Sequence, residues 1–329
     1  MNDLRKDLIL DRWVVIAENR SKRPCDFNKS ELEEKASCPL CPGNEEMTPP
    51  AYLVFSKSLS GKIIVLRDGE TREKNWAVRV FENLYPAFGP PDKESNAVGF
   101  HEVIVESPDH NEHPHKAKSS TLILLIRAYI ERIRELYSKD YINYSLIFRN
   151  HGKGAGASLS HPHTQIISTK IIPRYVKEKL DVFNRFKDCP YCDIIKREKE
   201  SERVFYRDDF FMVFCPYSSR SPFEFQVLPK RHMKSIIDMN DDEVISLAKI
   251  IKISLNALSK LIDEFLYNYW INIAPKNVED FHWHIEVLPK TCIRAGFELG
   301  SGMYINTTSP EEAASALRGK LGNIGTYSL

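Results

Sequence analysis

The spacing of apolar residues predicts two long helices. From about Thr121 to Tyr137, apolar residues recur at intervals of three and four, as on the buried face of a helix. A second helix is predicted from about Asp241 to Leu261. Asn240 stands at its N-cap position and Glu243 lies three residues later, an arrangement that indicates a capping box.

Short runs of β-branched and aromatic residues predict strands around each helix. These runs are HEVIVES (101–107), YSLIFRN (144–150) and QIIS (165–168) in the first half, and FEFQVLP (223–229), YWINIAP (269–275) and IEVLP (285–289) in the second. Because only short loops separate strand from helix, we expect an α+β fold. Each half should pack one helix on an antiparallel sheet.

The same order of features occurs twice along the chain. Each copy has a C-x-x-C pair, an apolar strand followed closely by a histidine, a helix, a second strand, a His-x-His motif and a third strand. We therefore expect two tandem halves, residues 1–175 and residues 176–329, with a charged linking helix around residues 170–188.

A last helix is predicted after the second copy. Ser309 stands at its N-cap, Pro310 in its first turn and Glu312 in the capping-box position. We expect this helix to be exposed.

Composition narrows the function without assigning it. The chain is 42% hydrophobic and 28% charged, with a formal net charge of +1, so it has no global attraction to nucleic acid or anionic membrane. Its N-terminus lacks the apolar core of a signal peptide, and no apolar run approaches the ~20 residues that span a bilayer. These features favour a cytoplasmic protein that binds phosphate, if at all, through local groups.

Two pairs of cysteines indicate metal sites. Four of the seven cysteines lie in CPLC (38–41) and CPYC (189–192). In an intracellular protein such pairs are metal or redox sites before they are disulfides. Zinc prefers four tetrahedral Cys and His ligands. The repeat thus predicts one zinc site from Cys38, Cys41, His110 and His161, and another from Cys189, Cys192, His232 and His282.

The other interpretation of the pairs is a redox dithiol or simple buried cysteines. Cys25, Cys215 and Cys292 are expected to be packing residues.

The motif His161-Pro162-His163-Thr164-Gln165 is the candidate catalytic centre. Residues two apart in an extended strand share a face, so zinc can hold His161 while His163 faces a pocket. A neutral His163 can attack phosphorus, and Gln165 can donate to a phosphate oxygen. The upstream loop 150–158 has small residues that let a phosphate approach the backbone, and its Asn150, Lys153 and Ser158 add donors.

The second His-x-His, His282-Trp283-His284, lacks the glycine-rich loop and is followed by Ile285-Glu286. It is interpreted as the non-catalytic copy, with His284 either a substrate contact or a structural histidine.

These motifs make the chain resemble the galactose-1-phosphate uridylyltransferase family of the histidine-triad superfamily, with features of ADP-glucose phosphorylase, over essentially its full length. The resemblance implies two histidine-triad-like halves and a ping-pong mechanism through a nucleotidyl-His163. It also nominates further substrate contacts. These are Arg20 and Arg23 in WVVIAENRSKRP, Asn83 in ENLYPAF (82–88), matched to a strand near the nucleoside, and Phe297 and Glu298 in GFELGSGMYIN (296–306), matched to the hexose-phosphate segment.

The chain departs from the best-known uridylyltransferases at two points. It has Asn83-Leu84 instead of an Asn-Asp pair, and Tyr304 or Asn306 where a Gln is usual. The expected substrates are a nucleotide sugar and a hexose 1-phosphate, with UDP-glucose first and a homodimer possible. An ADP-sugar phosphorylase is the alternative enzyme, and a zinc-dependent nucleotide- or nucleic-acid-binding module without catalysis is the alternative from another class.

Overall fold

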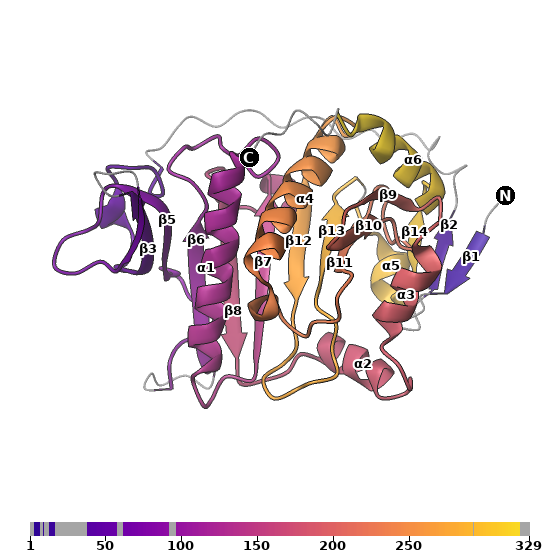
Figure 1. Ribbon diagram of the computed structural model, residues 1–329, viewed down its shortest axis with the longest axis horizontal. Coiled ribbons are helices and arrows are strands. Elements are labelled where there is room, and N and C mark those ends of the chain that lie inside the picture. The colour runs from indigo at the N-terminus through magenta and orange to yellow at the C-terminus, as the bar shows by residue number, and fades with distance from the viewer. Residues whose placement is uncertain are drawn as a thin grey trace.

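An antiparallel sheet runs through the whole molecule (Figure 1). The computed structural model describes residues 3–6, 9, 13–16, 38–57, 62–91, 97–291 and 293–322. Among these, eleven strands pair in the order β4-β3-β5-β6-β8-β7-β12-β13-β11-β10-β9. Their bounds are β3 Ala51–Lys57, β4 Ile63–Leu66, β5 Trp76–Glu82, β6 Gly99–Val105, β7 Tyr144–His151, β8 His163–Thr169, β9 Val204–Arg207, β10 Phe211–Phe214, β11 Phe225–Pro229, β12 Tyr267–Asn272 and β13 His284–Pro289.

The two copies of the repeat meet in the middle of this sheet. Strand β7 of the first copy pairs antiparallel with β12 of the second, and Phe148 lies opposite Trp270. Outward from this pair the corresponding strands follow in the same order, β8, β6 and β5 on one side and β13, β11 and β10 on the other. The α+β prediction is confirmed, and the sheets of the two halves are joined edge to edge into one.

Two long helices lie side by side on one face of the sheet (Figure 1). They are α1 (Ser119–Tyr137) and α4 (Asp241–Ser259), and their apolar faces are buried against the strands. The predicted capping box of α4 is present: the Glu243 amide donates to Asn240 Oδ1 at 2.9 Å, and the Asn240 amide donates to Glu243 Oε2 at 2.8 Å. This cap satisfies amides that the first helical turn leaves without partners.

The linking segment forms two helices, α2 (Arg174–Phe183) and α3 (Pro190–Glu198). The expectation of an exposed last helix is wrong. Helix α6 (Pro310–Lys320) buries Ala313, Ala314 and Leu317 against the α4 and β9 side of the molecule. Together with the buried Pro310, these three residues form a narrow apolar stripe, which is enough to dock a helix whose exposed positions are mostly polar.

The remaining elements are short. Strands β1 (Asp3–Lys6), β2 (Trp13–Ile16) and β14 (Tyr304–Asn306) form a small separate sheet next to α5 (Gly296–Ser301). The part of the chain that the structure describes also has the single 3-10 turns η2 (Glu45–Met47), η3 (Lys153–Ala155) and η4 (Ile236–Asp238). None of the helices among the described residues is long and apolar enough to cross a membrane.

Candidate active site and metal centres

The first predicted zinc site is assembled in the structure. The ligand atoms of Cys38, Cys41, His110 and His161 all lie within 4.8 Å of one another. The Cys41 sulfur lies 3.3 Å from His110 Nδ1 and 3.5 Å from His161 Nδ1. Tetrahedral zinc with bonds of about 2.3 Å to sulfur and about 2.0 Å to nitrogen separates these atoms by about 3.5 Å. The four side chains therefore fit a closed tetrahedral zinc site.

Hydrogen bonds orient both histidines of this site. His161 Nε2 lies 2.8 Å from the Ser107 carbonyl, so it carries the proton and leaves Nδ1 for a metal. His110 Nε2 lies 2.8 Å from Ser160 Oγ. Burial and the neighbouring Cys38 raise the pKa of the Cys41 thiol. Metal binding at this site would therefore release a thiol proton.

The second predicted site repeats this arrangement, with ligand atoms of Cys189, Cys192, His232 and His282 within 4.8 Å of one another. The Cys192 sulfur lies 3.5 Å from both His232 Nδ1 and His282 Nδ1. His282 Nε2 lies 2.8 Å from the Pro229 carbonyl, the counterpart of the Ser107 contact. Both C-x-x-C pairs thus lie beside two histidines, a donor set typical of structural zinc.

The nucleophile candidate His163 is the first residue of β8 and is 7% exposed. Its Nδ1 lies 2.8 Å from the His161 carbonyl, which can only accept, so Nδ1 carries the proton. Burial lowers the pKa of His163, which favours the neutral ring. Within the part of the chain that the structure describes, no hydrogen bond engages Nε2. His163 therefore presents one unprotonated ring nitrogen.

The alternation of side chains along β8 determines on which face of the sheet His163 lies. The Thr164 hydroxyl lies 2.8 Å from the Tyr129 hydroxyl of α1, so Thr164 faces the helices. His163 and Gln165 therefore face the side of the sheet away from α1.

The Gln165 amide is oriented by a histidine that the sequence analysis missed. His101 Nδ1 accepts from the Ala87 amide at 3.1 Å, so Nε2 carries the proton and donates to Gln165 Oε1 at 2.7 Å. Asn83 Nδ2 also donates to this oxygen, at 3.3 Å. The Gln165 oxygen is thus held twice, and no described residue engages the NH₂ group, which can donate to a ligand. The only sequence signal for His101 was its position on the same apolar run that leads to His110.

Asn83 is thus brought to Gln165, but not by a strand over residues 82–88, as the matched segment had suggested. Strand β5 ends at Glu82, and the Asn83 side chain accepts from the Tyr85 amide at 2.9 Å to form a turn. Pro86 has no amide proton to continue a ladder.

The predicted phosphate loop follows β7. Gly152 and Gly156 have positive φ values of 85° and 90°, and a Cβ on Gly152 would lie 2.2 Å from the Leu266 side chain. Lys153 and Ser158 are exposed on the loop. Asn150 instead supports it, accepting from Asn268 Nδ2 at 2.7 Å and donating to the Gly156 carbonyl at 3.4 Å.

The second copy places His284 where the first has His163, but its ring is fully engaged. Nδ1 lies 3.0 Å from the His282 carbonyl, as in His163. Nε2 lies 3.0 Å from Lys179 Nζ, which also donates to Glu286 Oε1 at 2.6 Å and to Asn272 Oδ1 at 3.0 Å. The position that would receive a ligand is thus filled by the ammonium group of a residue on α2.

The Lys179 ammonium group beside His284 lies within a set of opposite charges. Arg220 Nη2 lies 2.7 Å from Glu286 Oε2. Burial alone would raise the pKa of Glu286, but Lys179 and Arg220 outweigh it and hold that pKa well below its ordinary value. His284 is therefore a structural histidine in this state of the protein.

The remaining nominated residues lie elsewhere. Glu298 lines a cavity of about 610 Å³ together with Gly154 of the phosphate loop, Lys290 and Arg294. Phe297 is half exposed on α5, and among the described residues it makes no hydrogen bond or ring contact with His163. Arg20, Arg23, Cys25 and Cys292 lie outside the described residues. Cys215 is buried in the core, as expected.

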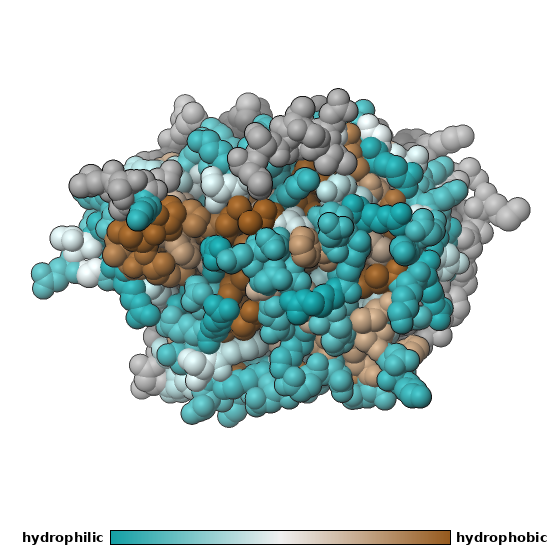
Figure 2. Space-filling model, viewed as in Figure 1, coloured by the Kyte–Doolittle hydropathy of each residue, from teal (hydrophilic) through white to brown (hydrophobic). Residues whose placement is uncertain are grey.

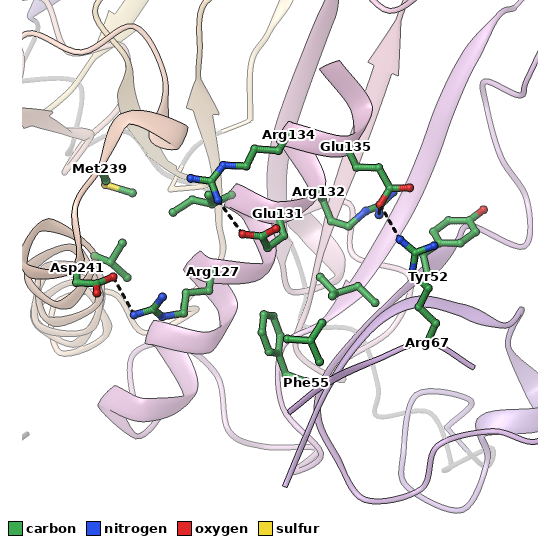
Figure 3. Close-up of a pocket in the computed structure, with 14 residues that line it drawn as sticks. Tyr52, Phe55, Arg67, Arg127, Glu131, Arg132, Arg134, Glu135, Met239 and Asp241 are labelled. Atoms are coloured by element: carbon green, nitrogen blue, oxygen red, sulfur yellow. Dashed lines mark hydrogen bonds and ion pairs between the residues drawn. The ribbon is translucent and has the colours of Figure 1, made fainter. Parts of the chain in front are cut away.

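A cavity of about 620 Å³ opens on the helix-covered face, between α1 and β3–β4 (Figure 3). Arg127 pairs with Asp241, Arg134 with Glu131, and Arg67 with Glu135. The nearby surface over β3 and β4 is apolar, with Val65 61% exposed (Figure 2). Because acids offset its arginines and His163 faces the other side of the sheet, this cavity is not the phosphate site.

The chain is similar over most of its length to proteins of known family. Residues 93–324 match the family described as "Domain of unknown function (DUF4921)". The chain is 30% identical to an ADP-glucose phosphorylase of Arabidopsis thaliana over 96% of its length and 92% of the relative's. It is 31% identical to a galactose-1-phosphate uridylyltransferase of Thermotoga maritima, over 97% and 98% of the two chains.

Solved structures give the same grouping. An Arabidopsis thaliana ADP-glucose phosphorylase with bound ADP-glucose superposes with a TM-score of 0.82 at 30% identity, covering 97% of this chain and 99% of the other. A uridylyltransferase mutant superposes with a TM-score of 0.72 at 26% identity, covering 98% and 99%.

Proposed function

Because this chain belongs to the galactose-1-phosphate uridylyltransferase family, whose named members are transferases, we propose that it transfers a nucleoside monophosphate through a covalent intermediate on His163. One observation carries the proposal. The His161 carbonyl keeps Nδ1 of His163 protonated, and no described residue engages its Nε2, whereas Nε2 of His284 is engaged by Lys179.

The reaction follows from these positions. Nε2 of His163 attacks the α-phosphorus of a nucleotide sugar, an N–P bond forms, and the bond to the bridging oxygen breaks, releasing the sugar 1-phosphate. The Gln165 NH₂ group donates to a non-bridging oxygen, and the phosphate loop with Lys153 and Ser158 adds donors. An oxygen of an acceptor phosphate then attacks the same phosphorus and restores free His163.

The two Cys₂His₂ groups are proposed to hold zinc. Each would tie a C-x-x-C turn to the start of a His-x-His strand, which fixes the backbone next to His163 in one copy and next to His284 in the other. Zinc supplies this bracing only.

UDP-glucose with galactose 1-phosphate as acceptor remains the first substrate choice, and an ADP-sugar phosphorylase is the alternative. The relatives of both kinds have nearly equal identity to this chain. Lys290, Arg294 and Glu298 share one cavity with the phosphate loop, which suits a phosphate and sugar hydroxyls. At the position where a Gln is usual, the chain offers Tyr304 or Asn306. Of these two residues, Asn306 has a structural role, because it is buried and donates to the Ser219 carbonyl at 2.9 Å.

Intact-protein mass spectrometry tests the proposal. Incubation with UDP-glucose or ADP-glucose, without acceptor, should leave a nucleotidyl adduct whose mass identifies the base. His163→Gly should form no adduct and keep both metal ions. Absence of adduct in wild type with every nucleotide sugar would refute covalent catalysis, and loss of a metal in His163→Gly would reverse the roles of His161 and His163. Light scattering of the same sample tests the homodimer.

A further inference from the structure

A buried polar network lies directly beneath the candidate nucleophile. Thr164 follows His163, and its hydroxyl donates to Glu106 Oε1 at 2.5 Å. The same carboxylate accepts from Arg149 Nε at 2.9 Å. All three side chains are at most 2% exposed. The network occupies the helix side of the sheet, opposite the imidazole of His163.

The network joins the three segments that build the site. The Glu106 amide donates to the carbonyl of Pro162, the residue before His163, at 3.0 Å. Arg149 Nη2 donates to His113 Nδ1 at 3.1 Å, three residues after the metal ligand His110. Arg149 also directly precedes Asn150, which supports the phosphate loop. One ion pair therefore contacts the metal segment, the nucleophile strand and the loop strand.

Two tyrosine hydroxyls complete the buried network. The Tyr129 hydroxyl of α1 lies 2.8 Å from Thr164 Oγ1 and 2.9 Å from the Tyr269 hydroxyl of β12. Thr164 is thus held from a helix of the first half and, through Tyr129, from a strand of the second.

Among its described residues, the non-catalytic copy has no such network on the helix side of the sheet. Ile285 follows His284 as Thr164 follows His163. Val227 pairs with Ile285 as Ile104 pairs with Thr164, so the next residue on the same face, Pro229, takes the place of Glu106. Ile285 and Pro229 are both buried apolar residues. Because apolar side chains pack this level of the sheet in one copy, packing alone does not require a buried ion pair in the other.

We propose that Thr164, Glu106 and Arg149 are positioning residues that fix the His163 backbone, and hence Nε2, relative to the phosphate loop. This inference rests on the proposed function of His163. Near-attack geometry is sensitive to small displacements, and supporting contacts of this kind are commonly worth 10–100-fold in rate. Their loss should slow transfer to His163 without weakening nucleotide-sugar binding.

The test compares Thr164→Val with Thr164→Ser. Valine keeps the shape and removes the hydroxyl, whereas serine keeps the hydroxyl. With the nucleotide sugar that labels wild type, the single-turnover rate of adduct formation at saturation should fall about 10-fold or more in Thr164→Val and stay within about threefold in Thr164→Ser. The dissociation constant and the metal content should be unchanged in both. Ser168→Ala is the matched control. Ser168 lies on β8 like His163 but at its other end, and the change removes a buried 2.7 Å contact to Ser145 of β7.

Three results would overturn the inference. The first is a wild-type rate of adduct formation in Thr164→Val. The others are an equal loss of rate in Thr164→Ser or Ser168→Ala, and a change in the dissociation constant without a change in rate. Tyr129→Phe provides a second variant if Thr164→Val fails to fold, and a wild-type rate there would also count against it. Absence of adduct in wild type would instead be a failure of the proposed function.

Discussion

His163 and His284 hold the same place in the two His-x-His motifs, and in both rings the carbonyl two residues earlier fixes Nδ1. Their difference lies at Nε2. Lys179 donates to Nε2 of His284, and the Tyr191 hydroxyl lies 3.1 Å from it. The proposed reactivity of His163, and not of His284, thus rests on which groups contact Nε2.

Lys179 is expected to matter for stability more than for catalysis. It is buried with Glu286, and removing one partner of a buried ion pair typically costs about 3–5 kcal/mol. Because Arg220 still pairs with Glu286, we expect Lys179→Met to lose about 3 kcal/mol in urea unfolding. Lys179→Met/Glu286→Gln should recover part of this loss. Peptide mapping should still find the nucleotide on His163 alone, and a label on His284 in wild type would contradict this assignment.

Buried His115 should make stability depend on pH. Burial, then the charges of Lys116 and Arg149, lower its pKa from 6.5 to about 4. The unfolded chain therefore takes up this proton first, so stability is full above about pH 6.5 and is lost as pH falls toward about 4. His115→Phe should remove about 1–2 kcal/mol of that loss, a figure reduced for partial solvent screening. Urea unfolding at pH 7 and pH 4.5 measures this loss of unfolding free energy. An equal loss in the variant and in the wild type would contradict the prediction.

Individual site residues were predictable where a motif carried them. The eight candidate metal ligands came from spacing repeated in two copies, and the structure brings each set of four together. His101 could not be found in this way, because its contact with Gln165 spans two strands far apart in sequence. The supporting role of Asn150 likewise depends on Asn268, 118 positions away.

Elements with a strong period were predicted well. Helices α1 and α4 and the six strands of the repeat lie close to their expected ranges. Strands β3, β4, β5, β9 and β10 were missed, because no repeated motif marks them and short apolar runs fit either helix or strand. Joining of the sheets was also not predictable, since β7 and β12 pair through backbone groups that any sequence carries.

The α4 capping box gives a prediction at the scale of an element. Asn240→Ala should lower the free energy of unfolding by about 1 kcal/mol, because it removes an acceptor from the first helical turn. Lys118 holds the same position on α1 without a side-chain cap, so Lys118→Ala is the matched control and should change little. Equal effects in chemical unfolding would show that the cap contributes nothing.

At the scale of the molecule, the two Cys₂His₂ groups belong to different copies of the repeat. Only the first includes a residue two positions from His163. Cys38→Ser/Cys41→Ser should lose one metal ion and slow adduct formation by about 10-fold or more. Cys189→Ser/Cys192→Ser should also lose one ion and some stability but retain the adduct rate within about threefold. Elemental analysis with single-turnover kinetics measures both, and equal kinetic losses would contradict a local role for the first site.

The β7–β12 pair also determines how the chain could be divided. A cut near residue 175 would leave each fragment with a long bare edge, β7 on one and β12 on the other, whose amides and carbonyls lack their partners. Each fragment alone would be prone to aggregate through that edge. When the two fragments are produced together, their edges are complementary and pair in a fixed register. The protein is therefore a candidate for a split reporter, in which activity returns only when the two fragments bind each other.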